Sequence, residues 1–266
     1  MKIFDCITFY QENFISNIRF EILNDYVDYF VVCESCFDHM GNKKKFKFKL
    51  LNHRFQKKLI YLKIDKPFLK NNSPWKNQAI QREYIFNGLN LADPDDYILF
   101  SDPDEIPNPL SLKELKLVKN YGIFLQKTYC YKFNLFNKYE TPWEGTRICK
   151  KKNLRSINYM RQSIRKKNLI SPFWKFYKNK SIELISNGGW HFNSLLSPKE
   201  ISQKLKSFAH QEFSSAEYSD EAIIKKNILE HKDLFKRNFK YQKVELDSTF
   251  PKFILKNKEL FQEWIL

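Results

Sequence analysis

The sequence has few glycines and few cysteines, and both shortages limit what the chain can be. Six glycines among 266 residues leave no glycine- or serine-rich linker, and no internal repeat is visible, so the composition favours one domain over two. Five cysteines, scattered at irregular spacing, are typical of a reducing compartment rather than of a disulfide framework. Cys33 and Cys36 form a CxxC pair, but no second CxxC accompanies it to complete a zinc site.

Long apolar runs are also missing. No stretch approaches the roughly 20 residues of a membrane-spanning helix, and the opening segment MKIFDCITFYQE carries carboxylates where a signal peptide would be apolar. We therefore expect a cytoplasmic protein. Acidic residues number 30 against 46 lysines and arginines, and the net charge is +16. Such a charge attracts phosphate, nucleic acid or acidic lipid, although a lysine-rich composition with solvated side chains explains it equally well.

Four short segments rich in β-branched and aromatic residues predict the strands of a sheet, at residues 2–9, 28–35, 58–64 and 95–101. After the first of them, Phe14, Ile15, Ile18 and Ile22 recur at the spacing of a helix. A second helical pattern precedes the fourth strand. Because strands that alternate with helices form parallel sheets, the sequence predicts an α/β fold with a mostly parallel central sheet.

Three helix starts can be placed from their capping residues. Trp75 and Ala79 of the first helix are expected to face the sheet, and the third helix carries an apolar stripe of Ile201, Leu205 and Phe208. The expected N-caps are Ser73 before Pro74, Ser111 with Glu114, and Ser197 with Glu200.

The most informative segment is DDYILFSDPDEIPNP, residues 95–109, in which an apolar strand runs directly into an acidic turn. Ligands of open parallel sheets bind beyond the carboxyl ends of the strands, where Asp102 and Asp104 are expected to lie. Paired carboxylates bind Mg²⁺ or Mn²⁺, which in turn binds a diphosphate. The alternative is an ordinary solvated turn, since Asp, Pro and Asn are common turn residues.

A second cluster is SNGGWHFNS, residues 186–194. Gly188 and Gly189 permit a close backbone approach, Trp190 offers a flat face to a sugar or base, and His191 is a candidate ligand. A tight turn with a buried Trp and a hydrogen-bonded His is the alternative. Further along, SFAHQEF places His210 and Glu212 where they complete a site or cap a helix end.

Two basic features complete the candidates. Arg82, preceded by Gln81, lies on the helix before the acidic strand, where its guanidinium can bind a diphosphate or remain an exposed charge. The run KKKFKFKLLNHRF, residues 43–55, interleaves lysine with phenylalanine. This pattern suits a nucleic-acid strip, but it fits a strand or hairpin with one apolar face at least as well.

Six ordered blocks together resemble glycosyltransferase family 17, over most of the chain. Asp102 and Asp104 match the position of a DxD motif in that family. The stretch KNQAI between Trp75 and Gln81 departs from the family, which is usually richer in Glu and Arg there. The blocks are DCITFYQE at 5–12, VDYFVVCES at 27–35, Trp75 with Gln81 and Arg82, SDPDEIPNP at 101–109, GGWHF at 188–192 and SFAHQEF at 207–213.

The resemblance implies a single GT-A-type, Rossmann-like domain over residues 1–266, with a C-terminal helical extension. Residues 1–110 would be the nucleotide-sugar-binding half and residues 111–266 the acceptor half. The implied reaction is an inverting transfer, with a divalent ion (Mn²⁺ or Mg²⁺), from UDP-N-acetylglucosamine to a glycan or glycolipid. Asp102, Asp104 and His191 would hold the ion, with His210 as the alternative histidine. The implied contacts to the nucleotide sugar are Phe9, Tyr10, Glu12, Glu34, Gln81, Arg82, Asp102 and Trp190.

The catalytic base is the least determined role. Glu212 is the first choice, His210 and Glu105 are further candidates, and Glu144 suits the chemistry without support from the family pattern. The acceptor is expected on the cytoplasmic side of a membrane, with peripheral contact to anionic lipid at its inner face. The rival functions are a metal-dependent phosphohydrolase or nuclease, in which water attacks, and a basic nucleic-acid-binding protein; nucleic acid is not the expected partner.

Overall fold

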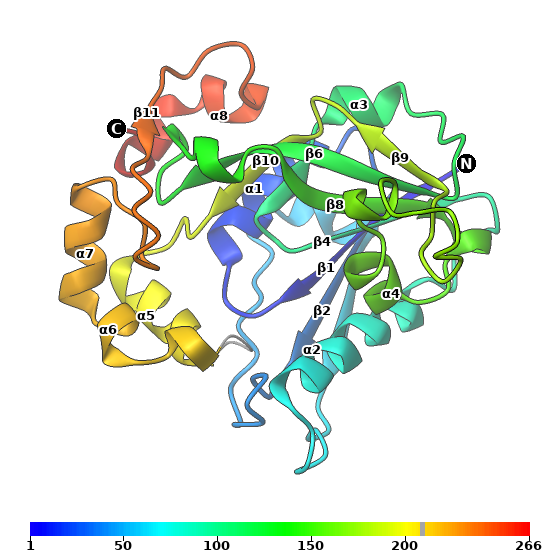
Figure 1. The fold of residues 1–266 in the computed structure, drawn as a ribbon, viewed down its shortest axis with the longest axis horizontal. Coiled ribbons are helices and arrows are strands. Elements are labelled where there is room, and N and C mark those ends of the chain that lie inside the picture. The colour runs from blue at the N-terminus through cyan, green and yellow to red at the C-terminus, as the bar shows by residue number, and fades with distance from the viewer. Residues whose placement is uncertain (208–210) are drawn as a thin grey trace.

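The computed structural model describes residues 1–207 and 211–266 as an α/β fold, with helices packed on both faces of a central sheet (Figure 1). Four strands form its parallel part, in the spatial order β3-β2-β1-β4. All four confirm strands expected from the sequence. They are β1 (Ile3–Phe9), β2 (Tyr29–Ser35), β3 (Leu59–Ile64) and β4 (Tyr97–Ser101).

Beyond β4 the sheet becomes mixed. Strand β8 (Trp143–Lys150) pairs antiparallel with β4, and β6 (Tyr121–Cys130) pairs antiparallel with β8. Strands β9 (Ile182–Ile185) and β10 (Gly189–Asn193) run parallel to β6. One sheet therefore joins strands from residues 1–110 to strands from residues 111–266. The remaining strands are β5 (Glu105–Pro107), paired with β10, β7 (Leu135–Phe136), paired with β6, and β11 (Gln242–Lys243), which pairs with β7 at the edge of the sheet.

Two layers of helices cover the sheet, because alternate residues of each strand point to opposite faces. One core contains Ile15 and Ile18 of α1 (Asn13–Leu23) and Ile254 of α8 (Lys252–Lys256). The opposite core contains Ile85 of the 3-10 segment η2 (Tyr84–Gly88), which continues α2 (Pro74–Glu83), and Met160 of α4 (Ile157–Gln162). The other helices are α3 (Pro109–Lys113), α5 (Pro198–Ser207), α6 (Ala216–Ser219) and α7 (Glu221–Leu229).

Helix α2 begins as predicted but turns a different face inward. The Ser73 hydroxyl accepts the Lys76 N–H at 3.3 Å, and Pro74 occupies the first turn. Trp75, expected to face the sheet, is 46% exposed, so that prediction is wrong. The buried face of α2 carries polar side chains instead, among them Gln81 and Arg82.

Of the two other expected caps, one is confirmed and one is wrong. At the start of α5 the Glu200 N–H donates to Ser197 Oγ at 3.3 Å, while Glu200 Oε2 accepts the Ser197 N–H at 2.9 Å. Helix α3 is capped not by Ser111 but by Asn108, whose Oδ1 accepts the Leu110 N–H at 3.1 Å. Asn108 precedes Pro109, and this is the same cap-then-proline signature as at α2.

The basic run at 43–55 is an extended segment, not a strand or a hairpin, up to the 3-10 segment η1 (His53–Lys58). Two asparagines of α1 act as its pairing partners. Asn13 Nδ2 donates to the Lys47 carbonyl at 2.7 Å and Asn17 Nδ2 to the Lys49 carbonyl at 3.0 Å. Phe48 packs on the core, whereas Phe46 is 36% exposed. The alternation of Lys and Phe therefore serves a half-buried strap.

All five cysteines are free and buried. Within residues 1–207 and 211–266, none of the helices combines the length and hydrophobicity needed to cross a bilayer.

Candidate active site

The acidic turn lies at the carboxyl end of β4, beside the carboxyl end of its parallel neighbour β1, as the sequence predicts. The Glu105 N–H donates to the Asp102 carbonyl at 3.0 Å and closes the turn. In return Glu105 Oε2 accepts the Asp102 N–H at 3.1 Å. These reciprocal bonds fix the direction in which the Asp102 and Asp104 side chains leave the backbone.

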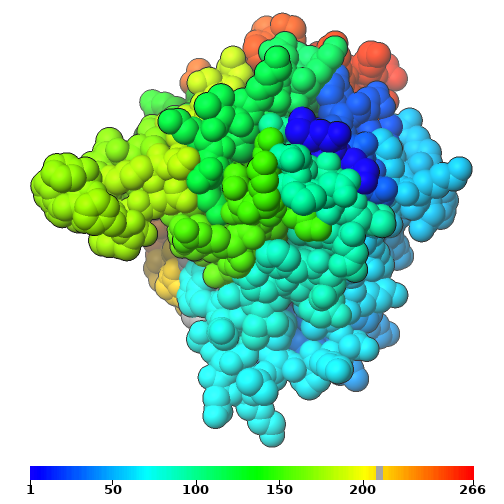
Figure 2. All heavy atoms as spheres, turned by 90° about the vertical axis from the view of Figure 1, so that its right-hand side faces the viewer, coloured from blue at the N-terminus to red at the C-terminus, as the bar shows by residue number. Residues whose placement is uncertain are grey.

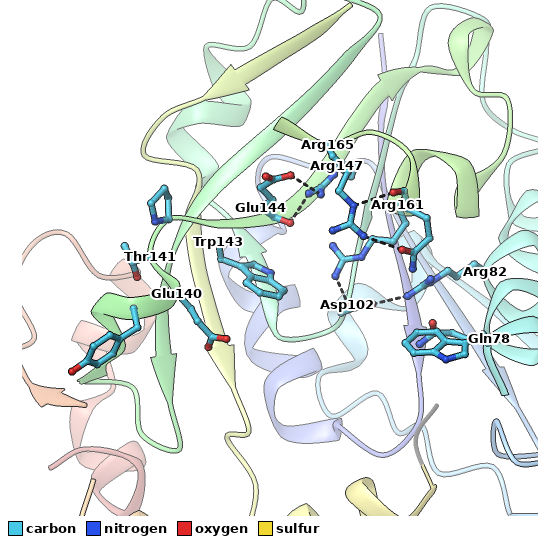
Figure 3. A pocket seen from close by; sticks show the side chains of 14 residues that line it. Gln78, Arg82, Asp102, Glu140, Thr141, Trp143, Glu144, Arg147, Arg161 and Arg165 are labelled. Atoms are coloured by element: carbon cyan, nitrogen blue, oxygen red, sulfur yellow. Dashed lines mark hydrogen bonds and ion pairs between the residues drawn. The ribbon is translucent and has the colours of Figure 1, made fainter. Parts of the chain in front are cut away.

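Arg161 of α4 holds the turn from the side (Figure 3). Its Nη2 lies 2.6 Å from Asp102 Oδ2 and 2.7 Å from Glu105 Oε1, and its Nη1 lies 2.9 Å from Glu105 Oε2. The indole N–H of Trp143 also donates to Glu105 Oε1, at 2.7 Å. Glu105 is 1% exposed and both its oxygens are engaged, so it acts as the anchor of the turn.

Asp102 is the acidic side chain that reaches the open space, with 35% of its side chain exposed. Burial alone would raise its pKa, but Arg161 and then Arg82 outweigh burial and lower it. Arg82 Nη2 lies 4.0 Å from Asp102 Oδ1. Burial lowers the pKa of Arg82 to about 10, so the guanidinium stays charged at neutral pH. Its Nε is buried and meets no acceptor among the described residues.

Asp104 points to a different set of groups. His191 Nε2 lies 3.9 Å from Asp104 Oδ1, because β10 pairs with β5 and sets His191 opposite Glu105. Lys204 Nζ of α5 lies 3.8 Å from Asp104 Oδ2 and 3.3 Å from Glu12 Oε1. Burial raises the pKa of Asp104, and Lys204 and His191 offset this only in part.

The donor chemistry around Asp104 fits a divalent cation. A carboxylate oxygen and an imidazole nitrogen both bind Mn²⁺. Asp104 lacks full compensation of its charge, as its raised pKa indicates, and His191 Nδ1 is buried without a hydrogen-bond partner among the described residues. The same part of the chain contains no ready-made group of three or more His, Cys, Asp or Glu ligands. Asp102 is the third donor nearby, and Arg161 engages its Oδ2.

A pocket of about 560 Å³ opens beside Asp102 (Figure 3). The Trp143 ring reaches it and stacks on His191, with ring centroids 4.8 Å apart and an interplanar angle of 24°. The exposed Trp75 also lines the pocket. Aromatic faces and charged groups in a pocket of this size suit a sugar with its phosphates. The lining comprises Trp75, Gln78, Arg82, Asp102, Tyr139, Glu140, Thr141, Pro142, Trp143, Glu144, Arg147, Arg161, Gln162 and Arg165.

Of the side chains expected along the nucleotide, Arg82 lies 4.0 Å from Asp102, and Glu12 at the end of β1 is linked to Asp104 through Lys204. Glu12 accepts the N–H groups of Tyr10 and Gln11 at 3.2 and 2.9 Å. Burial would raise its pKa, but Lys204 and these N–H groups lower it. The amines of Lys44 and Lys47 lie 5.3 and 5.8 Å from the centre of the Tyr10 ring. This end of β1 is therefore polar and charged, and Lys204 connects it to the acidic turn.

Other expected nucleotide contacts have partners within the protein. Phe9 is 1% exposed and belongs to the core. Glu34 accepts the Lys44 amine at 2.7 Å and two backbone N–H groups of the basic strap. Gln81 Nε2 donates to the Phe9 and Cys33 carbonyls at 3.2 and 3.0 Å, and so ties β1 to β2. Trp190 is buried and donates to the Thr249 carbonyl at 3.1 Å, away from the pocket lining.

Of the two residues expected after α5, Glu212 is exposed in the 3-10 segment η6 (Gln211–Phe213) and is not among the pocket-lining residues. His210 lies outside the described residues. Sequence reasoning missed Arg161, Trp143 and Lys204, which reach the acidic turn from elsewhere in the chain. Lys204 lies on the polar side of an amphipathic helix, where a lysine is normally expected to be solvated. No local sequence pattern singles out Arg161 or Trp143.

Comparison with known proteins identifies the family of the chain. The model of glycosyltransferase family 17 matches residues 1–247. The chain belongs to glycosyltransferase family 17. This confirms the resemblance drawn from the six sequence blocks.

Named relatives of this family 17 chain include the human and rat proteins called beta-1,4-mannosyl-glycoprotein 4-beta-N-acetylglucosaminyltransferase. Each is 25% identical over 238 residues, which cover 80% of this chain and 44% of the relative. The mouse protein of the same name matches to the same extent. The chain thus spans less than half the length of these relatives.

Proposed function

We propose that the chain is an inverting, metal-dependent glycosyltransferase of GT-A type that transfers N-acetylglucosamine from a UDP-sugar to a hydroxyl of a glycan or glycolipid. Membership of family 17 and the names of the relatives support the transferase and the sugar. The parallel strand order β3-β2-β1-β4, with the acidic turn after β4, supports a nucleotide site of Rossmann-like kind.

The observation that carries the proposal is the pairing of Asp102 with two arginines at the edge of the pocket. Arg161 is committed to Glu105 and Asp102, whereas Arg82 keeps a buried Nε without an acceptor among the described residues. A buried donor of this kind costs free energy until a ligand satisfies it. Diphosphate oxygens would accept from Arg82 in the charge-assisted geometry that guanidinium groups favour.

A divalent ion would be held by Asp104 and His191, with Asp102 beside them. When bound, it would stabilise the negative charge of the departing diphosphate as a Lewis acid. Lys204 holds Glu12 and Asp104 close together and balances their charge before any ligand arrives. Trp143, stacked on His191, would present its edge and remaining ring surface to the sugar.

For the base that deprotonates the acceptor we propose Glu144, which lines the pocket, ahead of Glu212. Glu144 Oε2 accepts the Lys166 N–H at 3.0 Å and lies 3.5 Å from Arg147 Nη2, and its side chain is 28% exposed. A carboxylate at the wall of the pocket would lie within reach of an acceptor bound there. Glu105, with both oxygens engaged, holds the turn instead.

Donor binding separates this function from its rivals. In thermal shift with UDP-N-acetylglucosamine and Mn²⁺, we expect stabilisation that needs both components, because a ligand raises the stability of the state it binds. Arg82→Met should lose the nucleotide effect while keeping its fold. Cleavage of nucleic acid or of phosphate esters without sugar transfer would favour a phosphohydrolase. Tight, salt-sensitive nucleic-acid binding that survives Asp102→Asn with Asp104→Asn would favour a binding module.

A further inference from the structure

The segment between α4 and β9 exposes aromatic side chains to an unusual degree. Phe173 and Tyr177 are each 78% exposed, Phe176 is 86% and Trp174 is 61%. Across residues 1–207 and 211–266, no aromatic side chain outside this segment is more than 46% exposed. Ile170, at 86%, joins them. A monomeric soluble protein seldom exposes such a patch unless the patch binds something.

The segment has a defined shape rather than a loose one. It projects from the body as a lobe, yellow-green in Figure 2. Backbone turns close it, with the Lys175 N–H donating to the Pro172 carbonyl at 3.1 Å and the Lys178 N–H to the Lys175 carbonyl at 3.0 Å. At its base, Asn168 is buried and donates to the Ser163 carbonyl at 2.6 Å. Hydrogen bonds thus hold the backbone of the segment both at its turns and at its base.

The charge of the segment is of one sign. Residues 165–181 contain Arg165 and five lysines, at 166, 167, 175, 178 and 180, and no aspartate or glutamate. Exposed aromatic rings framed by lysines suit the interface of an anionic bilayer, where rings enter the headgroup region and ammonium groups meet lipid phosphates. Lysine is depleted in protein interfaces, so this composition favours lipid over a protein partner.

We propose that residues 170–177, flanked by these lysines, insert into the interface of an anionic membrane and dock the protein there. The segment begins beside the pocket, because Gln162 and Arg165 line it and Ile170 follows within a few residues. Docking through the lobe brings the pocket close to the lipid headgroups, where the sugar of a membrane-held glycolipid would reach it. The docking itself does not depend on the proposed transferase activity.

Vesicle flotation tests the docking directly. Wild-type protein should float with vesicles of phosphatidylcholine and phosphatidylserine, and much less with phosphatidylcholine alone. Phe173→Ser with Phe176→Ser should weaken this binding by about tenfold or more, since the variant lacks two rings that would be buried in the bilayer interface. The matched control, Leu229→Ser with Leu260→Ser, removes two side chains that are 72% and 73% exposed outside the segment and should bind like wild type.

Two further measurements identify the mode of binding. Lys166→Gln with Lys167→Gln should weaken binding and reduce its dependence on salt. Brominated lipids should quench tryptophan fluorescence in wild type, and Trp174→Phe should lose most of that quenching. The proposal fails if wild type does not bind anionic vesicles, or if the variant Phe173→Ser with Phe176→Ser binds them as wild type does. It also fails if that variant abolishes self-association instead, which would make the lobe a protein interface.

Discussion

Replacing Arg161 tests whether the acidic turn depends on a buried counterion. In Arg161→Met, Glu105 keeps the Trp143 N–H and the Asp102 N–H but loses both contacts to the guanidinium. Removing one member of a buried ion pair costs about 3–5 kcal/mol, because the other charge stays buried. The Arg161 side chain is only 10% exposed, so little of this is relieved by solvent. We expect urea unfolding to show that loss, with a fall in Tm of about 10 °C.

A double-mutant cycle makes the test specific. Adding Glu105→Gln to Arg161→Met removes the stranded charge and should recover about 1–2 kcal/mol of the loss. Arg165→Met is the matched control, since Arg165 lines the same pocket but, within residues 1–207 and 211–266, its guanidinium donates only to Gln162. This substitution should cost under about 1 kcal/mol. A loss in Arg161→Met no greater than in this control, or strictly additive losses in the double variant, would refute the reasoning.

Three other predictions concern the groups around the turn. Lys204→Met should cost about 2 kcal/mol at neutral pH by urea unfolding. Lys204 lowers the pKa of Glu12, so the ion pair stabilises the fold at pH values above the ordinary pKa of a glutamate. The loss of stability in Lys204→Met should therefore disappear as the pH falls through the lowered pKa of Glu12. Asp104→Asn should abolish thermal stabilisation by Mn²⁺ without destabilising the metal-free protein, because the pKa of Asp104 is raised and its ionised form is disfavoured. In wild type, Mn²⁺ affinity measured by calorimetry should weaken as the pH falls through that raised pKa; constant affinity would contradict the assignment. Trp143→Phe should lower kcat/KM about tenfold in a UDP-release assay while costing about 1 kcal/mol of stability, through loss of its bond to Glu105; unchanged kinetics would exclude Trp143 from the sugar site.

Local patterns predicted the parts of the fold that local physics decides. The apolar runs at β1 to β4 and the caps at Ser73 and Ser197 are confirmed, since each depends on neighbours in sequence. The mixed half of the sheet was not predicted, because the paired residues of β4 and β8 are more than forty positions apart in the sequence. Trp75 was misplaced because apolar spacing predicts the face that is buried, whereas α2 buries Gln81 and Arg82 against the strand ends.

The site divides in the same way. The acidic turn followed from a strand that runs directly into DPDE, and His191, which the family resemblance implied as a partner of the acidic pair, lies 3.9 Å from Asp104. The sequence could not reveal that the carboxylate oxygens of Glu105 are bound by Arg161 and Trp143. Those contacts join residues that are dozens of positions apart, and a side chain that lacks a periodic or motif context carries no signal of its partner.

The origin of the counterions bears on how the two halves of the chain cooperate. The acidic turn belongs to residues 1–110, but Arg161, Trp143 and Lys204 all come from residues 111–266. Strand β8 also covers the edge of β4 that β1 leaves open. Residues 1–110 alone would therefore expose that edge and leave Glu105 without its cation. Trp143 lines the pocket and donates to Glu105, and Glu105 accepts the Asp102 N–H, so a ligand that displaced the Trp143 ring would act on the turn that positions Asp102.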